Sequence, residues 1–516
     1  WMKIVVDGKT VREFIIELAP NARQADFIVP LDVSAWKGKK AMLIAEAVSS
    51  GSEWLKQVTL SDIRSDEKTA WREKYRPQFH FSPRLGWTND PNGLVFFDGK
   101  YHLFYQHNPF GVTWNNMTWG HAVSSDLFHW QELDDAIWPD ELGTIFSGSA
   151  AVDWKNSSRL GANGTTPLVA LFTYNGPSMR YGAKATQALA WSEDGGMSWK
   201  KYSGNPVLKN MVEGNRDPKI FWHEPTSSWI TPLYMSGNDY AIFRSPDLKN
   251  WEKACDVPAL GCSECPDLFE LPVDGNKAKT KWVFWGGNGL YVLGDFDGRS
   301  FVRQSSALQM KWGGNDYAAQ TYSDTPGRRI QISWMQGGHY PGMPFNQQFT
   351  VPRELTLKST PQGIRLCANP VAELNLLRRE HLQVARRPID GRSSFETIKS
   401  ELLDIEAVID PRESELIRWE INGRLFEFDL VKMNVKHADA TVPFVLENGR
   451  IRLRLVLDRT STELFLSGGQ TLLAACYLPE QSCELGEMKL RSRYITAVLE
   501  KMDVWSLKSS LPTSPK

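Results

Sequence analysis

Ser125-Asp126-Leu127-Phe128-His129-Trp130 combines a polar turn with a closing aromatic residue, and the same unit recurs three more times along the chain. The later copies are residues 192–199 (Ser-Glu-Asp-Gly-Gly-Met-Ser-Trp), 245–251 (Ser-Pro-Asp-Leu-Lys-Asn-Trp) and 297–301 (Asp-Gly-Arg-Ser-Phe). Their closing aromatic residues fall 69, 52 and 50 positions apart. This is about the period of a four-stranded propeller blade whose outer hairpin is pinned by an aromatic residue.

Between these turns the chain alternates or runs apolar over short lengths, as at residues 168–174 and 282–285. Gly, Pro and Asn residues separate the apolar segments, and no helical period is sustained. With the strands expected around residues 330–334, about five blades fit. The pattern predicts an all-β chain in which residues 73–356 form a five-bladed β-propeller.

The hydrophobic pattern of the sequence changes after the predicted propeller. A short helical pattern at residues 371–379 marks a predicted linker, residues 357–380. Residues 397–415 and 417–507 largely alternate between apolar and polar positions, as antiparallel strands with one wet face do. We therefore expect a C-terminal β-sandwich in residues 381–516.

Residues 1–72 predict a small N-terminal β-module ahead of the propeller. Four apolar segments, separated by turns, read as its strands: residues 3–6, 14–18, 25–31 and 40–45. The module either binds sugar or packs on the propeller. Packing is favoured, because the module has no clustered aromatic residues beyond Trp36 and Trp54.

One turn motif carries a candidate catalytic carboxylate. Asn89-Asp90-Pro91-Asn92-Gly93 is turn chemistry, because Pro fixes φ, Gly supplies a positive φ, and Asn and Asp side chains bond their own backbone. A hairpin with an Asp98-Gly99 turn is predicted directly after it. Asp90 would then sit on a rigid turn at a strand mouth, where it is either a nucleophile or only a cap of the turn.

Two further acids stand in comparable settings. Asp217 lies in Arg216-Asp217-Pro218-Lys219 before an apolar strand, and Glu264 lies between Cys262 and Cys265 before another. Three such carboxylates indicate acids gathered at one mouth of the propeller. Retaining hydrolysis of a glycosidic bond needs one ionised carboxylate as nucleophile and one protonated acid. A third carboxylate can hold sugar hydroxyls and favour an oxocarbenium-like transition state.

These three blocks resemble the signatures of glycoside hydrolase family 32, the β-fructosidases. The resemblance covers roughly residues 75–505 and includes, in family order, blocks at residues 104–109, 119–124, 146–150 and 317–321. It implies a five-bladed propeller with a C-terminal sandwich. It also implies Asp90 as nucleophile, Glu264 as acid/base and Asp217 as transition-state stabiliser, with no cofactor and no metal.

The resemblance further places a set of side chains around a terminal fructose: Asn89, Gln106, Trp114, Phe146, Ser147 and Arg216. Amide and hydroxyl groups suit sugar hydroxyls, and aromatic rings can wall a pocket. Trp114 has the alternative of a place in a blade core. Trp312 and Trp334 are two additional candidates for lining the pocket.

The proposed chemistry sets expectations for protonation. Turn amides would favour the ionised form of Asp90, and an apolar, Cys-lined neighbourhood would raise the pKa of Glu264. Arg216 would pair with Asp217 and keep that carboxylate charged.

Composition bounds the class of protein. With 516 residues, two or more domains are expected. The 59 basic and 60 acidic residues balance without a basic run, which argues against nucleic acid or an anionic membrane as partner, and no apolar run approaches a membrane span. The six Cys residues are too sparse for a disulfide scaffold and lack zinc-site spacing, although a Cys255–Cys262 bridge stays open.

The leading hypothesis is an exo-acting enzyme that removes terminal β-fructofuranosyl units from levan or inulin and also splits sucrose. The alternatives are a sucrose-preferring invertase, an endo-acting levanase and a non-catalytic propeller lectin. The three carboxylates argue against the lectin, because a binding module needs no acid of raised pKa. Because the chain begins at Trp1, we expect a trimmed N-terminus and a secreted, periplasmic or cell-surface protein. A monomer is expected, with an oligomer as the alternative.

Overall fold

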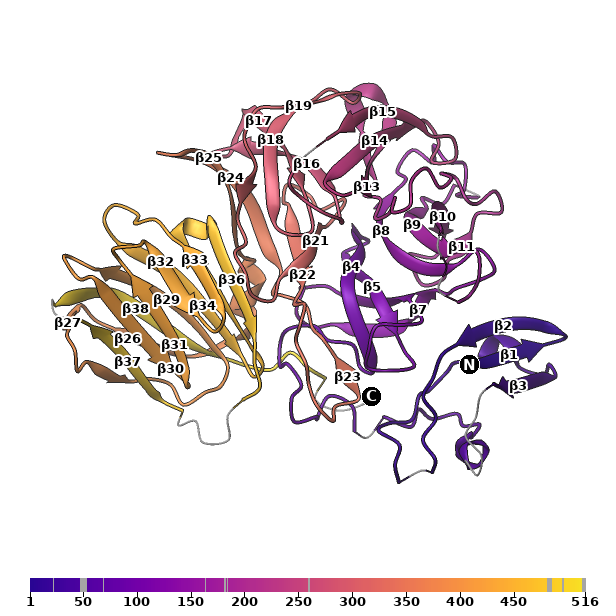
Figure 1. Ribbon diagram of the computed structural model, residues 1–516, viewed down its shortest axis with the longest axis horizontal. Coiled ribbons are helices and arrows are strands. Elements are labelled where there is room, and N and C mark those ends of the chain that lie inside the picture. Colours follow the sequence, from indigo (N-terminus) through magenta and orange to yellow (C-terminus); the bar gives the residue numbers. More distant parts are fainter. Residues whose placement is uncertain are drawn as a thin grey trace.

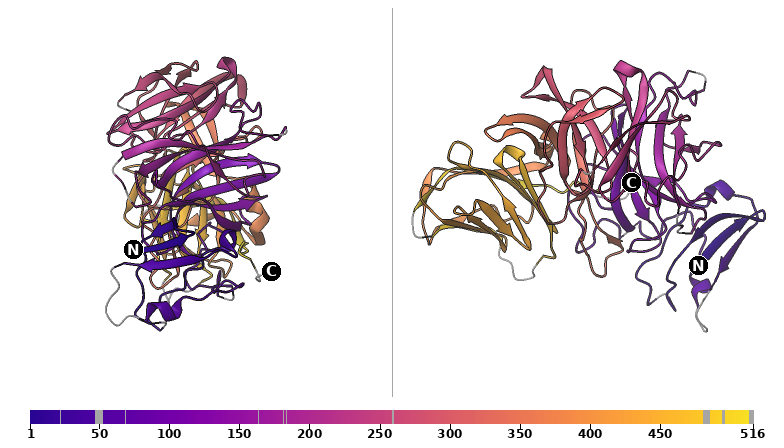
Figure 2. Two further views of the ribbon diagram at one scale, coloured as in Figure 1. Left: turned by 90° about the vertical axis from the view of Figure 1, so that its right-hand side faces the viewer. Right: turned by 45° about the horizontal axis from the view of Figure 1, so that its top comes forward.

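The computed structural model describes residues 1–512 except 22, 47–52, 68, 163, 181, 183, 259, 480–484 and 494–495. Its regular structure is almost entirely β-strand, as predicted. A propeller occupies the centre, and the small N-terminal module and the C-terminal sandwich lie on opposite sides of it (Figures 1 and 2). No helix among the described residues is long and apolar enough to cross a membrane.

Each of the first four blades is built from consecutive antiparallel strands. The first two contain β4 (Gly86–Phe97), β5 (Lys100–Asn108), β6 (Thr118–Ser124) and β7 (Gln131–Ile137), then β8 (Thr144–Val152), β9 (Leu168–Gly176), β10 (Lys184–Ser192) and β11 (Lys200–Lys201). The next two contain β12 (Phe221–His223), β13 (Ser228–Ser236), β14 (Asp239–Ser245) and β15 (Glu252–Val257), then β16 (Asp267–Val273), β17 (Asn276–Trp285), β18 (Leu290–Phe296) and β19 (Phe301–Arg303). Two short elements accompany them, η3 (Glu224–Thr226) and β20 (Leu308–Gln309).

The repeated turn unit joins the third and fourth strands of each of these blades. In every copy the aspartate accepts backbone N–H groups from residues two to four positions later, at distances of 2.7–3.0 Å. The aspartates are Asp126, Asp194, Asp247 and Asp297. The repeat is therefore a side-chain cap of the outer hairpin, and the prediction drawn from it is confirmed.

The linker between the propeller and the sandwich is shorter than predicted, because the fifth blade extends to Pro370. It contains β21 (Tyr317–Thr321), β22 (Ile330–Trp334), β24 (Arg353–Thr360) and β25 (Gly363–Pro370), and β23 (Phe345–Asn346) reaches across to pair with β4. Residues 357–370 are thus blade strands and not linker, because all eight residues of β25 pair with β24. Only η4 (Ala372–Leu377) separates the propeller from the sandwich, and its Leu374 and Leu377 are buried.

The C-terminal unit is a sandwich of two antiparallel sheets around one apolar core. One sheet holds β26 (Arg378–Val384), β27 (Arg387–Ile389), β29 (Leu403–Asp410), β34 (Ile451–Asp458), β35 (Ser461–Leu466), β36 (Thr471–Cys476) and β38 (Ala497–Leu507). The other holds β28 (Ser394–Glu396), β30 (Leu416–Ile421), β31 (Arg424–Asp429), β32 (Asn434–His437), β33 (Ala440–Pro443) and β37 (Glu487–Ser492). The short η5 (Ser467–Gly469) follows β35.

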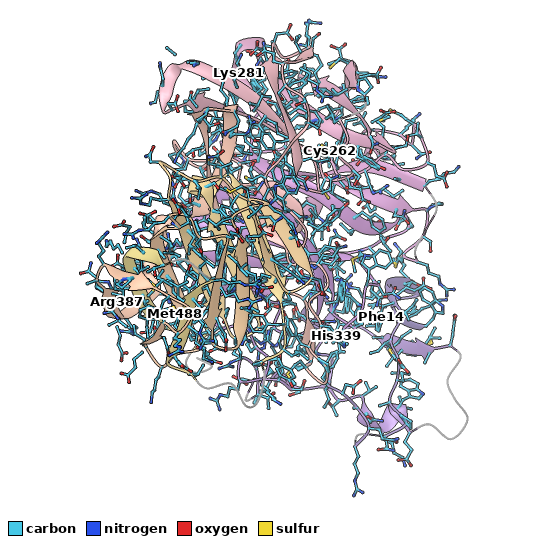
Figure 3. The ribbon with its side chains drawn as sticks, turned by 60° about the vertical axis from the view of Figure 1, so that its left-hand side comes forward. Phe14, Cys262, Lys281, His339, Arg387 and Met488 are labelled. Carbon is cyan, nitrogen blue, oxygen red and sulfur yellow. The ribbon has the colours of Figure 1, made fainter. Side chains whose placement is uncertain are left out.

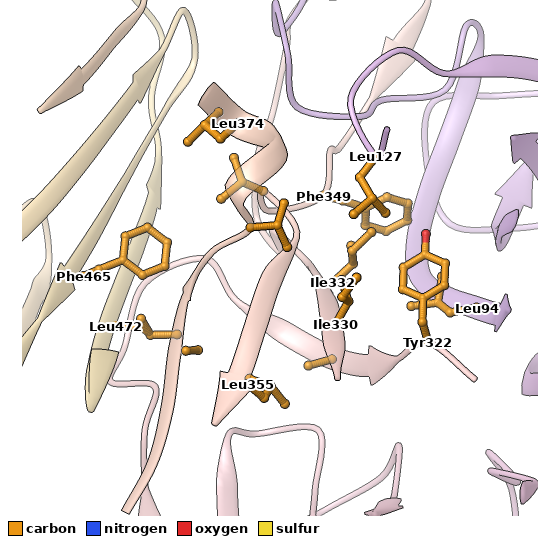
Figure 4. Packing of buried hydrophobic residues seen from close by; sticks show 14 of the residues in the cluster. Leu94, Leu127, Tyr322, Ile330, Ile332, Phe349, Leu355, Leu374, Phe465 and Leu472 are labelled. Carbon is orange, nitrogen blue, oxygen red and sulfur yellow. The ribbon is translucent and has the colours of Figure 1, made fainter. Parts of the chain in front are cut away.

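The propeller and the sandwich share a continuous apolar core. Leu94 and Tyr322 of the blades belong to the same buried cluster as Phe465 and Leu472 of the sandwich (Figure 4). The buried His80 adds a polar link, because its ring contacts Asp458 at 2.8 Å and Glu463 at 2.9 Å. The sandwich is therefore packed as a fixed support of the propeller.

His80 predicts a loss of stability in alkaline solution. Burial lowers its pKa, but hydrogen bonds to Asp458 and Glu463 outweigh burial and raise the pKa to about 9. Since this value exceeds that of an unfolded histidine, the contribution is complete below about pH 6.5 and disappears as pH rises through about 9. The shift corresponds to about 3 kcal/mol.

Urea denaturation of the wild type and of His80→Asn, followed from pH 6 to pH 10, measures this effect. The free energy of unfolding of the wild type should fall more steeply than that of the variant. Parallel curves for the two proteins would remove His80 as the cause.

The N-terminal module is a three-stranded sheet with the order β2 (Lys9–Phe14), β1 (Met2–Val6) and β3 (Ala41–Ala45), accompanied by η1 (Ser34–Trp36) and η2 (Trp54–Gln57). The strand predicted at residues 25–31 is wrong, because that segment pairs with no neighbour and has no strand geometry. Phe14, labelled in Figure 3, stacks on Phe110 of the propeller at 3.8 Å. The side chain of Asn116 exchanges two hydrogen bonds of 2.8 Å with the backbone of Ile15. These contacts agree with packing on the propeller.

The structure answers whether a disulfide bridge joins Cys255 and Cys262. Cys255 and Cys262 are both free thiols, so no bridge joins them. Cys483 lies outside the described residues.

Candidate active site

Asp90 is held inside strand β4 and not on a turn before it. The register with β5 shifts between Thr88 and Pro91 and again between Asn92 and Val95, so the motif forms two bulges in the strand. Gly93 is required there, because its φ is +54° and a Cβ would lie 2.6 Å from the ring of Phe104. The predicted hairpin with the Asp98-Gly99 turn follows and is confirmed.

The carboxylate of Asp90 is positioned by two donors. Ser147 Oγ donates to one oxygen at 2.6 Å, and Asn89 Nδ2 donates to the other at 3.2 Å. Ser147 comes from β8 of the next blade, whereas Asn89 comes from β4 itself. Both oxygens are therefore directed by side chains that the sequence had placed near the substrate.

Asp217 and Glu264 stand just before the inner strands β12 and β16. Both adopt left-handed backbone conformations, with φ of 62° and 53°. Such conformations in non-glycine residues are strained and cluster at functional sites. The backbone N–H of Asp217 donates to Thr173 Oγ1 at 3.0 Å, which fixes the bend before β12.

The side chain of Glu264 lies between a phenol and a guanidinium. Tyr317 OH donates to Oε2 at 2.5 Å, and Arg216 Nη2 donates to Oε1. Tyr240 OH bonds the backbone oxygen of the same residue at 3.2 Å. Arg216 lies farther from its sequence neighbour, with 3.8 Å between Nε and Asp217 Oδ2. The predicted ion pair between Arg216 and Asp217 is therefore present, but the shorter contact of the guanidinium is with Glu264.

Cys265 joins the three carboxylates into one site. Its Sγ lies 3.7 Å from Asp90 Oδ2 and 3.6 Å from Asp217 Oδ2, and its backbone N–H donates to Asp217 Oδ2 at 3.2 Å. Since Cys265 follows Glu264 in the chain, acids from three blades converge around it. Sequence reasoning assigned no role to Cys265 or Tyr317, although the Glu-Cys pair and the 317–321 block were the signals that marked them.

The electrostatics differ from the sequence expectations. Burial raises the pKa of Asp90, and burial with the nearby charges of Asp90 and Glu264 raises that of Asp217 to about 7 despite Arg216. Burial also acts to raise the pKa of Glu264, but hydrogen bonds from Tyr317 and Arg216 overcome it and leave the pKa lowered. The expected low pKa at Asp90 and raised pKa at Glu264 are thus both reversed.

The predicted fructose-contacting residues fall into two groups. Trp114 is 44% exposed and meets Phe146 edge-on at 6.0 Å, next to Ser147, so it is not part of a blade core. Gln106 is buried on β5, and its amide Nε2 has no hydrogen-bond partner in the described structure. These side chains suit a sugar that brings hydroxyls and an apolar face.

The other two predicted tryptophans do not contact the carboxylates directly, and their place in the pocket stays a prediction. Trp334 is 9% exposed and packs edge-on against Trp87 at 6.2 Å between ring centres, and Trp87 Nε1 donates to Asn89 Oδ1 at 3.2 Å. Trp312 packs against the sandwich core. No contact found among the described residues joins either of them to the carboxylates. Among the described residues, no group of three or more His, Cys, Asp or Glu side chains is arranged to hold a metal ion.

The domain matches agree with this geometry. Residues 80–370 match the Glycosyl hydrolases family 32 N-terminal domain, and residues 412–506 match the Glycosyl hydrolases family 32 C terminal. The chain belongs to glycoside hydrolase family 32. The resemblance drawn from the sequence blocks is confirmed, and the first of these matches ends where β25 does.

Several family 32 relatives are similar over most of their length. A levanase of Bacillus subtilis (strain 168) is 36% identical over 467 residues, which cover 81% of this chain and 68% of the levanase. An extracellular exo-inulinase of Aspergillus ficuum is 31% identical over 484 residues, covering 79% and 90%. The crystal structure of an exo-inulinase from Aspergillus awamori superposes with a TM-score of 0.77 at 27% identity, covering 86% of this chain and 100% of that one.

The contacts of Glu264 predict the response of the pH–rate profile to Tyr317→Phe. Loss of the phenol removes a hydrogen bond that favours the ionised carboxylate, so the pKa of Glu264 should rise. The profile of kcat/KM should then move to higher pH. Tyr240→Phe is the matched control, because Tyr240 bonds only the backbone oxygen of Glu264. Identical profiles for the two variants would contradict the prediction.

Proposed function

We propose that this family 32 enzyme is a retaining exo-β-fructosidase that removes terminal β-D-fructofuranosyl units from fructans and also hydrolyses sucrose. The convergence of Asp90, Asp217 and Glu264 around Cys265 is the observation that supports it most directly. The levanase and exo-inulinase relatives support the substrate class. The Aspergillus ficuum relative is an extracellular exo-inulinase, which supports action outside the cell.

In this proposal Asp90 attacks the anomeric carbon of the terminal fructose while Glu264 protonates the departing oxygen. A covalent fructosyl–enzyme forms, and Glu264 then deprotonates the water that releases fructose. Ser147 and Asn89 keep an oxygen of Asp90 aimed at the sugar. Asp217 binds fructose hydroxyls and stabilises the positive charge that develops in the ring.

Substrate is expected to change the proton affinities of these carboxylates. Without it, burial raises the pKa values of Asp90 and Asp217, whereas Tyr317 and Arg216 lower that of Glu264. Sugar hydroxyls that donate to Asp217 would favour its ionised form, and a glycosidic oxygen facing Glu264 would favour its acid form. Binding of the correct sugar therefore prepares both catalytic groups.

The aromatic pair of Trp114 and Phe146 supports a sugar-binding pocket. It stands beside Ser147 and therefore beside Asp90, where the terminal sugar would lie. Aromatic side chains beside a few polar groups are typical of small-molecule sites.

A product profile tests the proposal and separates it from its alternatives. Purified enzyme should release only fructose from levan and inulin from the first minutes, and fructose with glucose from sucrose. A ladder of oligosaccharides would indicate an endo-acting levanase, and cleavage of sucrose alone an invertase. Binding without any product would leave only the lectin.

A further inference from the structure

A cavity of about 490 Å³ lies at the opposite end of the inner strands from the three carboxylates. Strand β8 carries Ser147 beside Asp90 and ends at Val152, which lines this cavity. Phe221 and Phe269 line it from the strands that follow Asp217 and Glu264. The cavity therefore occupies the far mouth of the propeller, here called the distal cavity.

A buried polar plug separates the distal cavity from the active site. The ammonium group of Lys219 donates to the backbone oxygen of Thr321 and lies 3.8 Å from Asp267 Oδ2. The same carboxylate oxygen accepts the N–H of Thr321 at 2.8 Å. Since the side chains of Lys219 and Asp267 are only 3% and 1% exposed, the distal cavity is no passage for a leaving group.

Two tryptophan rings at the distal cavity are held in place without a ligand. Trp154 is 64% exposed, yet its Nε1 donates to Asp324 Oδ1 at 2.9 Å. Trp222 donates from Nε1 to Glu224 Oε2 at 2.5 Å and packs edge-on against Trp229, with ring centres 5.5 Å apart. Trp222 is only partly exposed, and the ammonium group of Lys155 lies over its ring at 5.1 Å, so Trp154 offers the free face. A ring that is already fixed lowers the ordering cost of binding.

The charges around the distal cavity favour a neutral ligand. Three cationic side chains and four carboxylates line it: Lys155, Lys219, Arg329, Asp153, Glu224, Glu270 and Asp324. Lys155 bonds Glu224 at 2.7 Å, whereas Arg329 donates to the backbone oxygen of Tyr322 at 3.2 Å and its Nε has no hydrogen-bond partner in the described structure. Because the carboxylates outnumber the cations four to three, an anion would meet a net negative lining. A polyhydroxylated neutral molecule would find flat rings, acceptors and donors together.

We propose that the distal cavity is a second carbohydrate-binding site that holds a segment of the fructan chain, with the ring of Trp154 as its platform. Its volume falls within the range typical of small-molecule sites. The identity of the sugar rests on the proposed function. A polymer held at this site stays close to the enzyme between cleavage events, which raises the effective concentration of chain ends at the active site.

Affinity electrophoresis in gels that contain levan or inulin measures binding by itself. Asp90→Asn serves as the background, because it leaves the polymer in the gel intact. In this background, the polymer in the gel should retard Trp154→Ala several-fold less than the parent protein. Trp154→Phe should keep most of the retardation. Glu224→Ala, at a carboxylate that is 70% exposed, is a second variant expected to reduce retardation. Met197→Ala is the control, because this apolar side chain is 59% exposed in the β10–β11 turn of the same blade and does not line the distal cavity.

Kinetics in the otherwise unchanged enzyme complete the test. Trp154→Ala should raise KM for polymeric fructan several-fold and leave sucrose hydrolysis at the level of Met197→Ala. Equal retardation and equal KM in the Trp154, Glu224 and Met197 variants would overturn the distal site. If the enzyme releases no fructose but retardation still depends on Trp154, the proposed function fails and the distal site stands. If the enzyme releases fructose but retardation does not depend on Trp154, the proposed function stands and the distal site fails.

Discussion

Asp90→Asn is expected to lower kcat on sucrose and fructan by roughly 10³- to 10⁵-fold, the range seen when a residue that takes part in bond making is removed. An amide cannot attack the anomeric carbon, whereas it can still occupy the place of the carboxylate. The neighbouring groups Ser147 and Asn89 contact Asp90 only through its oxygens, so the fold has no need of the charge. Fold can be checked by an unchanged melting temperature.

Glu264→Gln should cause a loss of similar size that depends on the leaving group. Without a proton donor, substrates whose leaving group needs no protonation should keep far more of their rate than sucrose. The retaining route also requires that the carboxyl groups of Asp90 and Glu264 lie about 5–5.5 Å apart in the complex with substrate. Proton NMR of the first-formed fructose should show the β-anomer. Initial release of the α-anomer, or near-normal turnover in either variant, would refute the assignment.

The propeller and the three acids could be predicted because their signals are local. The turn unit at residues 125–130 and its copies contain both the capping aspartate and the closing aromatic residue, so the blade period is visible without any long-range contact. Asp90 lies in a motif whose Pro and Gly set the backbone. The linker was harder to place, because residues 363–370 become a strand only by pairing with β24. The segment at residues 25–31 is apolar but has no neighbour to pair with, so it forms no strand.

The charge distribution could not be predicted, because it depends on neighbours that are distant in sequence. Arg216 adjoins Asp217 in the chain, yet its guanidinium contacts Glu264, 48 positions away. Tyr317 reaches the same carboxylate from the fifth blade. Burial, which raises the pKa of Asp90, arises from the packing of several blades at once. The sequence could therefore name the candidate acids but not the directions in which their pKa values shift.

Asp217→Asn is expected to lower kcat and kcat/KM together, by roughly 10²- to 10³-fold, the size expected for loss of one preorganised charged group. The physical reason is that the carboxylate interacts most strongly when the fructose ring becomes positively charged. Its Oδ2 accepts the N–H and the thiol of Cys265 and lies 3.8 Å from Arg216 Nε. An asparagine oxygen can still accept the N–H of Cys265, but it carries no negative charge to stabilise the cation that develops on the fructose ring.

The division of the effect between kcat and KM decides what Asp217 does. A loss confined to KM would make Asp217 a ground-state ligand of sugar hydroxyls, because binding equally strong in both states does not change turnover. Thr173→Val is a useful control. It removes the hydroxyl that accepts the N–H of Asp217 at 3.0 Å and leaves the carboxylate charged, so it tests position alone. If Thr173→Val were as harmful as Asp217→Asn, the placement of the backbone and not the charge would account for the loss. A milder effect on kcat in Thr173→Val is what charge stabilisation of the transition state requires.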